Sequence, residues 1–210
     1  MDRRASGLLI VAVLAAACGP TTTTGSSSTP TSPASSAAPS ISSPSASVVP
    51  SPTAPAQPVT FTSPLYGYTI TLPHGWSTTP AAFKWDGIGA PGHDSSMVDQ
   101  FSAGLGASLF AFAAPTRLDL AGYANDVIGR NARYHGDTCP PAPEVNEATT
   151  VGGVAAAFLG WNCGILINIV ATVDGGIGYQ FVMRDPAVQQ ATDANDRKLL
   201  DDMLATVKLP

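Results

Sequence analysis

The sequence predicts an α+β domain over residues 59–210, in which an antiparallel sheet is flanked by helices. Several short segments alternate polar and apolar residues and are separated by glycine or proline turns, as is typical of antiparallel hairpins. Two further segments repeat their apolar residues with helical spacing instead. Because strands arranged as hairpins with helices between and after them make an α+β fold, these observations together favour that class.

Residues 1–17 have the pattern of a secretory signal peptide. Two arginines precede the apolar run GLLIVAVLAAA, which is too short to span a bilayer as a stable helix. The stretch LAAAC ending at Cys18 resembles the bacterial lipoprotein signal, in which the cysteine is acylated, although Ala15 stands where that pattern prefers leucine. We therefore expect an extracytoplasmic protein held on the bacterial cell membrane by lipidated Cys18. The alternative is an ordinary secreted protein.

Residues 18–58 consist almost entirely of Ser, Thr, Pro and Ala, and no Asp, Glu, Lys or Arg occurs between Ala5 and Phe83. Such a segment cannot bury enough apolar surface to offset the entropy of ordering it. We expect a disordered tether. At about 3 Å per residue for a proline-rich chain, it would hold a domain on the order of 100 Å from Cys18.

The predicted domain is mildly acidic. Of the 15 acidic and 10 basic residues in the chain, 14 and 8 remain when Asp2, Arg3 and Arg4 are set aside. Nucleic acids and anionic membranes require clustered Lys and Arg, so a nucleic-acid partner is not expected.

The strands are predicted by alternation and by turns. VTFTS (59–63) and YGYTITL (66–72) form a hairpin around Pro64, with one buried face. The residues of that face are Tyr66, Tyr68, Ile70 and Leu72. Further strands are expected at 107–114, 153–163, 164–173 and 177–184. Asp174-Gly175-Gly176 is a strong hairpin turn between the last two, and the Gly152-Gly153 pair marks a similar break.

Two helices are predicted by their apolar stripes. The first spans 118–134 and packs Leu120, Tyr123, Ala124, Val127 and Ile128, while Asp119, Asp126, Arg130 and Arg133 lie away from the stripe. The second begins at Thr192 or Asp193 with Asp196 in its first turn. It buries Leu199, Leu200, Met203, Leu204 and Val207.

The two cysteines of the domain predict a disulfide. If Cys18 carries the lipid, Cys139 and Cys163 remain as a pair in an oxidising compartment. The rival interpretation is a thiol nucleophile or a metal site, but neither cysteine has a Cys-x-x-Cys partner or a suitably spaced histidine.

Phe61 to Trp76 resembles the PsbP-like family: a Tyr-Gly-Tyr strand (66–68) runs into Pro73-x-Gly75-Trp76, and a terminal helix ends in LLDDMLATVKLP. The resemblance implies an α/β/α sandwich over residues 59–210, in which Pro73 and Gly75 make the turn and Trp76 caps the edge of the core. It carries over no catalytic residue and no cofactor. The family mostly binds and scaffolds.

The segment 83–101 is the candidate site. It places Trp85, Asp86, His93, Asp94, Asp99 and Phe101 in a long glycine-rich insertion. Long loops inside compact domains are often functional, and aromatic walls with carboxylates suit a small polar ligand, a sugar or a divalent cation. The alternative is that Trp85 and Phe101 simply pack on the sheet. Gly87 to Gly92 has G-x-G-x-x-G spacing but lacks the strand and helix of a nucleotide site.

Three functions follow. The first is a non-catalytic binding or accessory module on the cell surface, with an unknown small molecule or envelope protein as partner. The second is a structural envelope protein. The third is a small hydrolase using His93, Asp94 and Ser95 or Ser96, although adjacent residues do not by themselves make a catalytic geometry. No metal or cofactor is expected.

Replacing Cys18 with serine tests the anchor. Because two acyl chains hold a protein stably on a bilayer and the serine variant carries none, we expect Cys18→Ser to release the protein into the medium. Fractionation followed by immunoblotting measures this, and unchanged retention in the membrane fraction would contradict lipidation.

Overall fold

The computed structural model describes residues 57–210, apart from 90–94, 105, 136–137 and 189–192. By its internal contacts the chain divides into residues 1–50 and 51–210, and every described residue belongs to the second unit. The expected signal peptide, Cys18 and nearly all of the expected tether therefore lie outside the described residues, and the lipid anchor stays a prediction.

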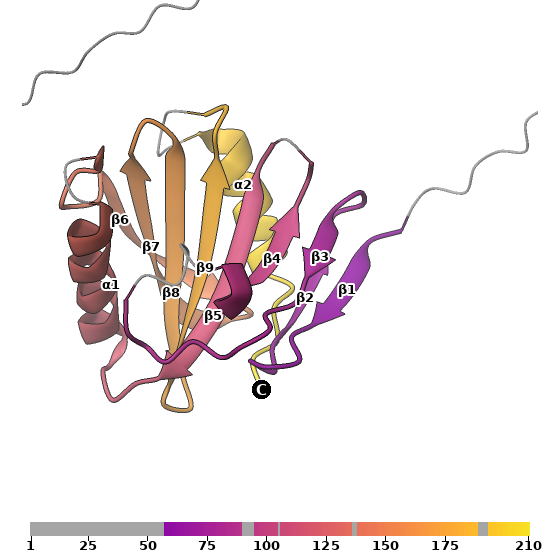
Figure 1. Ribbon diagram of the computed structural model, residues 1–210, viewed down its shortest axis with the longest axis horizontal. Helices are drawn as coiled ribbons and strands as arrows, with labels where there is room; N and C mark the ends of the chain where they lie inside the picture. Colours follow the sequence, from indigo (N-terminus) through magenta and orange to yellow (C-terminus); the bar gives the residue numbers. More distant parts are fainter. Residues whose placement is uncertain (1–56, 90–94, 105, 136–137, 189–192) are drawn as a thin grey trace, which may run out of the picture. The chain divides into compact units, whose positions relative to one another are not determined.

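The fold is α+β, as the sequence predicts. A seven-stranded antiparallel sheet has the order β3-β4-β5-β9-β8-β7-β6, and a separate two-stranded sheet pairs β1 with β2 (Figure 1). The strands of the large sheet are β3 (Ser77–Thr79), β4 (Asp99–Ser102), β5 (Ser108–Pro115), β6 (Val145–Val151), β7 (Val154–Asn162), β8 (Leu166–Asp174) and β9 (Ile177–Asp185). The other elements are β1 (Val59–Thr62), β2 (Thr69–Leu72), the short helix η2 (Ser95–Met97), α1 (Leu120–His135) and α2 (Ala194–Leu204).

The glycine turns lie where the sequence predicts them. Gly175 and Gly176 have φ of 56° and 78° between β8 and β9, and Gly152 and Gly153 have φ of 57° and 86° between β6 and β7. Glycine is the residue that adopts these values without steric cost. The strands β3, β4 and β6 were not predicted: β3 and β4 are too short to show alternation, and β6 leaves most of its residues exposed.

The side chains of the large sheet separate into two faces. On one face, which we call the α1 face, Gln180 of β9 donates to the Tyr123 hydroxyl of α1 over 3.1 Å. On the other face, which we call the α2 face, the Cζ atom of Arg197 in α2 lies 3.8 Å from the ring centroid of Phe158 in β7. Helices thus cover opposite faces, which makes the sandwich that the sequence predicts; Figure 1 shows α2 behind the strands.

The β1–β2 hairpin packs on the α2 face rather than joining the large sheet. Tyr68, Ile70 and Leu72 are fully buried beneath it. The Tyr68 ring meets Phe181 of β9 edge-on at 5.6 Å, and Phe61 meets Phe101 of β4 at 5.1 Å. The buried face predicted for this hairpin is therefore confirmed.

Helix α1 lies where its apolar pattern predicts, but its packed side is broader than expected. Tyr123 and Val127 are buried as predicted. A Cβ atom at Gly178 would stand 2.4 Å from the Tyr123 ring, so this close approach requires glycine in β9. Arg130 was predicted to point away from the packed stripe; this is wrong, since it is only 7% exposed.

Helix α2 begins as the sequence predicts. The Asp193 carboxylate accepts hydrogen bonds from the backbone N–H groups of Asn195 and Asp196, at 2.9 and 3.0 Å. This satisfies two of the free donors at a helix N-terminus. Leu200, Met203 and Leu204 are buried from the same helix.

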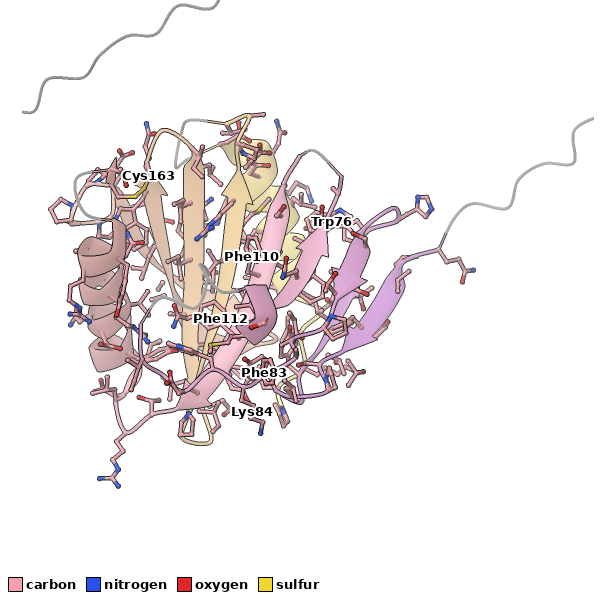
Figure 2. All side chains as sticks on the ribbon, viewed as in Figure 1. Trp76, Phe83, Lys84, Phe110, Phe112 and Cys163 are labelled. Atoms are coloured by element: carbon pink, nitrogen blue, oxygen red, sulfur yellow. A yellow bond between two sulfur atoms is a disulfide. The ribbon has the colours of Figure 1, made fainter. Side chains whose placement is uncertain are left out.

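Cys139 and Cys163 form the predicted disulfide, with their Cα atoms 4.5 Å apart. Cys139 is buried, and the bond fastens the segment after α1 to the residue that follows β7 (Figure 2). It closes a loop with a sequence separation of 24.

Removing this disulfide with the double variant Cys139→Ser, Cys163→Ser should lower the free energy of unfolding by about 3 kcal/mol, because the cross-link restricts the unfolded chain. Urea denaturation measures the loss. Intact-mass analysis after alkylation without reductant supplies the control: the wild type should take up no reagent at either cysteine, and two modified thiols would contradict the bond.

Candidate functional site

The segment between β3 and β4 crosses from the α2 face to the α1 face of the large sheet. The pairing of β4 with β5 ends at Ala111, so among the described residues the last part of β5 pairs only with β9. The backbone N–H groups of Ala82 and Phe83 are held by the Ser96 carbonyl, at 2.8 and 3.1 Å. The chain passes over the free part of β5 here, and Figure 2 shows Phe83 and Lys84 beside the lower half of that strand.

Two of the predicted site residues lie in β4 rather than in a loop. Asp99 and Phe101 are fully buried on the α2 face, and Phe101 packs edge-on against Phe61. The prediction that Asp99 and Phe101 lie in a glycine-rich insertion is therefore wrong. The reason is that η2 and β4 end the insertion earlier than the glycines suggested.

The Asp99 carboxylate connects three parts of the chain. Its Oδ2 accepts from the Tyr68 hydroxyl and its Oδ1 accepts from the backbone N–H of Ala81, both at 2.8 Å. A buried carboxylate needs such donors, because burying a charge without them is costly. Burial is the main cause that raises the pKa of Tyr68 well above its ordinary value, with the adjacent Asp99 charge adding to it.

Trp85 is also part of the core, at 3% exposure. Its ring meets Phe112 edge-on at 5.0 Å, its indole N–H donates to the Ile88 carbonyl, and its backbone N–H donates to the Tyr66 hydroxyl. That hydroxyl donates in turn to the carbonyl of Met97. The alternative considered from the sequence, that Trp85 and Phe101 pack on the sheet, therefore describes both rings.

The remaining predicted residues of the segment contribute differently. Asp86 is exposed, and its Oδ1 accepts from the Ile88 backbone N–H at 2.8 Å, which is a local turn. His93 and Asp94 lie outside the described residues. The hydrolase hypothesis depends on His93 and so stays a prediction.

Arg130 of α1 holds the crossing segment in place, a role that the sequence did not reveal. Its guanidinium lies 4.8 Å from the Trp85 ring and 5.8 Å from the Tyr123 ring. Its Nη1 donates to the Gly87 carbonyl at 3.3 Å, and its Nη2 lies 3.0 Å from Asp126. An arginine with a carboxylate partner and aromatic faces is stabilised in a buried position.

A cavity of about 400 Å³ lies where the crossing segment passes the end of the sheet. Its lining comes from the β1–β2 turn, the crossing segment, β5 and the β8–β9 hairpin. The lining residues are Leu65, Tyr66, Lys84, Trp85, Ala113, Ala114, Pro115, Asp174, Gly175, Ile177, Tyr179 and Pro210. Aromatic walls with few polar groups are typical of small-molecule sites.

The polar groups of this cavity are one cation, one carboxylate and phenol hydroxyls. Lys84 is exposed at the edge of the cavity. Asp174 lies near Tyr179 on the neighbouring strand β8, because it is two residues from Thr172, which is paired with Tyr179. Tyr179 is 4% exposed, and its hydroxyl has no hydrogen-bond partner among the described residues. Burial chiefly raises the pKa of Tyr179, and the charge of Asp174 raises it further. A hydroxyl without a protein partner in the wall of a cavity leaves one donor and one acceptor for a ligand.

A second hollow of about 440 Å³ lies between α1 and the strands β6 and β7. It is lined mainly by alanines with Asn125, Asn146 and Glu147, and it contains no aromatic wall. Across the described parts of the chain, no three His, Cys, Asp or Glu side chains are grouped so as to hold a metal ion, and none of the helices is both long and apolar enough for a bilayer.

The fold and the cavity define an α+β sandwich domain with an aromatic-lined pocket at one end of its sheet. No protein-family model matches the sequence, and no curated protein matches it. Among solved structures, the chain is similar to cyanobacterial PsbP (CyanoP) from Synechocystis sp. PCC 6803, with 16% sequence identity and a TM-score of 0.49 over 76% of this chain and 96% of that one.

A crystal structure from Bacteroides thetaiotaomicron VPI-5482 is also similar, with 14% identity and a TM-score of 0.37. The match covers 68% of this chain and 45% of that chain. The α+β class is established by the strand order and by the helices on the two faces.

The role of Asp99 can be tested by a single substitution. We expect Asp99→Asn to lower the free energy of unfolding by about 2 kcal/mol, because the amide offers one acceptor oxygen where two donors converge. Urea denaturation checks this. Asp86→Asn, at an exposed carboxylate, is the matched control and should stay within about 0.5 kcal/mol of the wild type; an equal effect of both substitutions would refute the assignment.

Proposed function

We propose that this chain is a non-catalytic binding module on the bacterial cell surface, which takes a small amphipathic ligand such as a sugar in the cavity beside Lys84, Asp174 and Tyr179. The observation that carries the proposal is Tyr179, a residue that lines a cavity of about 400 Å³ and whose hydroxyl has no partner among the described residues. Acylated Cys18 would supply the anchor and residues 18–58 the spacer.

The cavity favours a ligand that is apolar on one side and polar on another. Tyr66, Trp85 and Ile177 supply carbon surface against which a ring can pack. Hydroxyl groups on the ligand would meet Tyr179, Lys84 and the Asp174 carboxylate, which together provide donors and acceptors. A sugar ring has this combination of an apolar face and a hydroxylated edge.

The walls of the cavity are held in place by contacts within the protein, which supports a preformed site. Tyr66 and Trp85 are both buried, and the backbone N–H of Trp85 donates a hydrogen bond to the Tyr66 hydroxyl at 3.0 Å. Trp85 is held from its other side by Phe112 and Arg130. Walls that are already ordered cost little conformational entropy when a ligand binds.

Thermal-shift measurements with D-glucose, D-galactose and N-acetylglucosamine test this function. At least one sugar should raise the melting temperature of the wild type, because a ligand that binds the native state adds stability. Tyr179→Phe removes only the unpartnered hydroxyl and should abolish most of that rise, as should Lys84→Gln.

Tyr134→Phe is the matched control, because Tyr134 is 47% exposed on α1 and is not among the residues that line this cavity. It should respond to sugar as the wild type does. No rise with any sugar, or an equal rise in all variants, would overturn the proposal for this class of ligand.

A further inference from the structure

Arg184 of β9 is a partly buried arginine that has no counter-ion among the described residues. It lies on the α1 face, since it is four residues along the strand from Gln180, and its guanidinium stacks over Phe110 with 5.3 Å between Cζ and the ring centroid. Its Nε is buried without a hydrogen-bond partner among the described residues. None of the salt bridges of the described chain involves it.

This arrangement is costly for the protein alone. Removing a guanidinium from water is unfavourable unless an acceptor replaces the lost hydration. Burial accordingly lowers the pKa of Arg184 from its ordinary value, and no charged partner in the described part of the chain offsets that effect. An acceptor from outside the protein would remove this cost.

Two further buried donors lie on the same face. Trp161 of β7 and Arg184 are both register partners of Ile167 in the strand between them, which puts their backbones about 10 Å apart. The indole N–H of Trp161 and the side-chain amide nitrogen of Asn131 on α1 are buried without partners in the described chain. Asn131 belongs to the helix that packs against β7 and β8.

We propose that the α1 face carries an oxyanion-binding site centred on Arg184, to which the free N–H groups of Trp161 and Asn131 contribute. The three groups, which have no partner among the described residues, are all nitrogen donors, and donors without acceptors are the complement of an anion. The site is separate from the cavity at Tyr179, which is lined by residues of the β8–β9 turn, whereas Arg184 is next to the other end of β9.

The geometry selects a carboxylate or phosphate group. A guanidinium presents a planar edge of N–H groups, and that edge matches two oxygens of a carboxylate or phosphate. The ligand class is therefore a small molecule or group that ends in one of these oxyanions.

The test uses ¹⁵N NMR of the exported chain, titrated separately with inorganic phosphate and with acetate against chloride at constant ionic strength. The signals of the Trp161 indole N–H and the Arg184 Nε–H should move saturably with at least one anion. The indole signal of Trp85 should not follow, because that N–H already donates to Ile88. Saturation by phosphate alone or by acetate alone identifies the group.

Arg184→Gln should weaken the anion's affinity by about tenfold or more, because the removed hydrogen bonds are made by a charged group. Arg184→Lys keeps the charge without the planar fork and should bind more weakly than wild type. Arg117→Gln, at an exposed arginine, is the control and should leave affinity unchanged.

The free energy of unfolding, measured without ligand, distinguishes a loss of anion binding from a loss of folding. Without added oxyanion, Arg184→Gln should be at least as stable as the wild type, since it removes an unpaired charge. If the variant fails to fold, Arg184→Lys decides the question. Shifts that grow linearly without saturation, or an unchanged affinity in both Arg184 variants, would overturn the site.

Discussion

The hydrogen bonds of the buried Asp99 carboxylate are the constraint on which the rest of the arrangement depends. Asp99 lies in the large sheet, Tyr68 in the hairpin and Ala81 at the start of the crossing segment, and all three meet at one carboxylate. The bonds fix the hairpin on the α2 face and the point from which the chain leaves toward the α1 face. Trp85 comes four residues after Ala81, so the hydrogen bond at Ala81 restricts where Trp85 can lie.

Tyr66 extends this constraint to the cavity. Its hydroxyl accepts from the Trp85 backbone and donates to the Met97 carbonyl, so the two ends of the described insertion are held by one side chain. Arg130 then fastens the far side of the segment to α1 through the Gly87 carbonyl. The cavity wall is therefore a product of long-range polar contacts rather than of local loop structure.

These contacts explain which features the sequence could predict. Alternation predicted β5, β7, β8 and β9, and glycine turns predicted the β8–β9 hairpin, because both signals are local. The buried role of Asp99 depends on partners 31 and 18 residues away. A carboxylate in a glycine-rich stretch has the same local signature whether it faces solvent or a tyrosine hydroxyl, so sequence reasoning placed it in a ligand loop.

The site was predicted only in part for the same reason. Trp85 was named, but its neighbours in the cavity, Tyr179 and Asp174, come from a hairpin about 90 residues later, and their alternation indicated only a strand. Lys84 lies beside Trp85 in the sequence and was passed over. A cavity formed by the end of a sheet and a distant segment has no local pattern.

Arg130 and Arg184 show why the unpaired guanidinium is informative. Both lie on the α1 face, and the guanidinium of each lies over an aromatic ring. Packing of the arginine stem and contact with a ring therefore explain the burial of both residues equally well and do not distinguish them. Arg130 in addition has Asp126 and the Gly87 carbonyl, whereas Arg184 has neither kind of partner in the described chain. In a chain with net charge −5, carboxylates are plentiful, so a buried cation could readily have been paired. Because Arg184 has no counter-ion among the described residues, its charge is available to an external acid group, and this difference from Arg130 supports the oxyanion site that we propose.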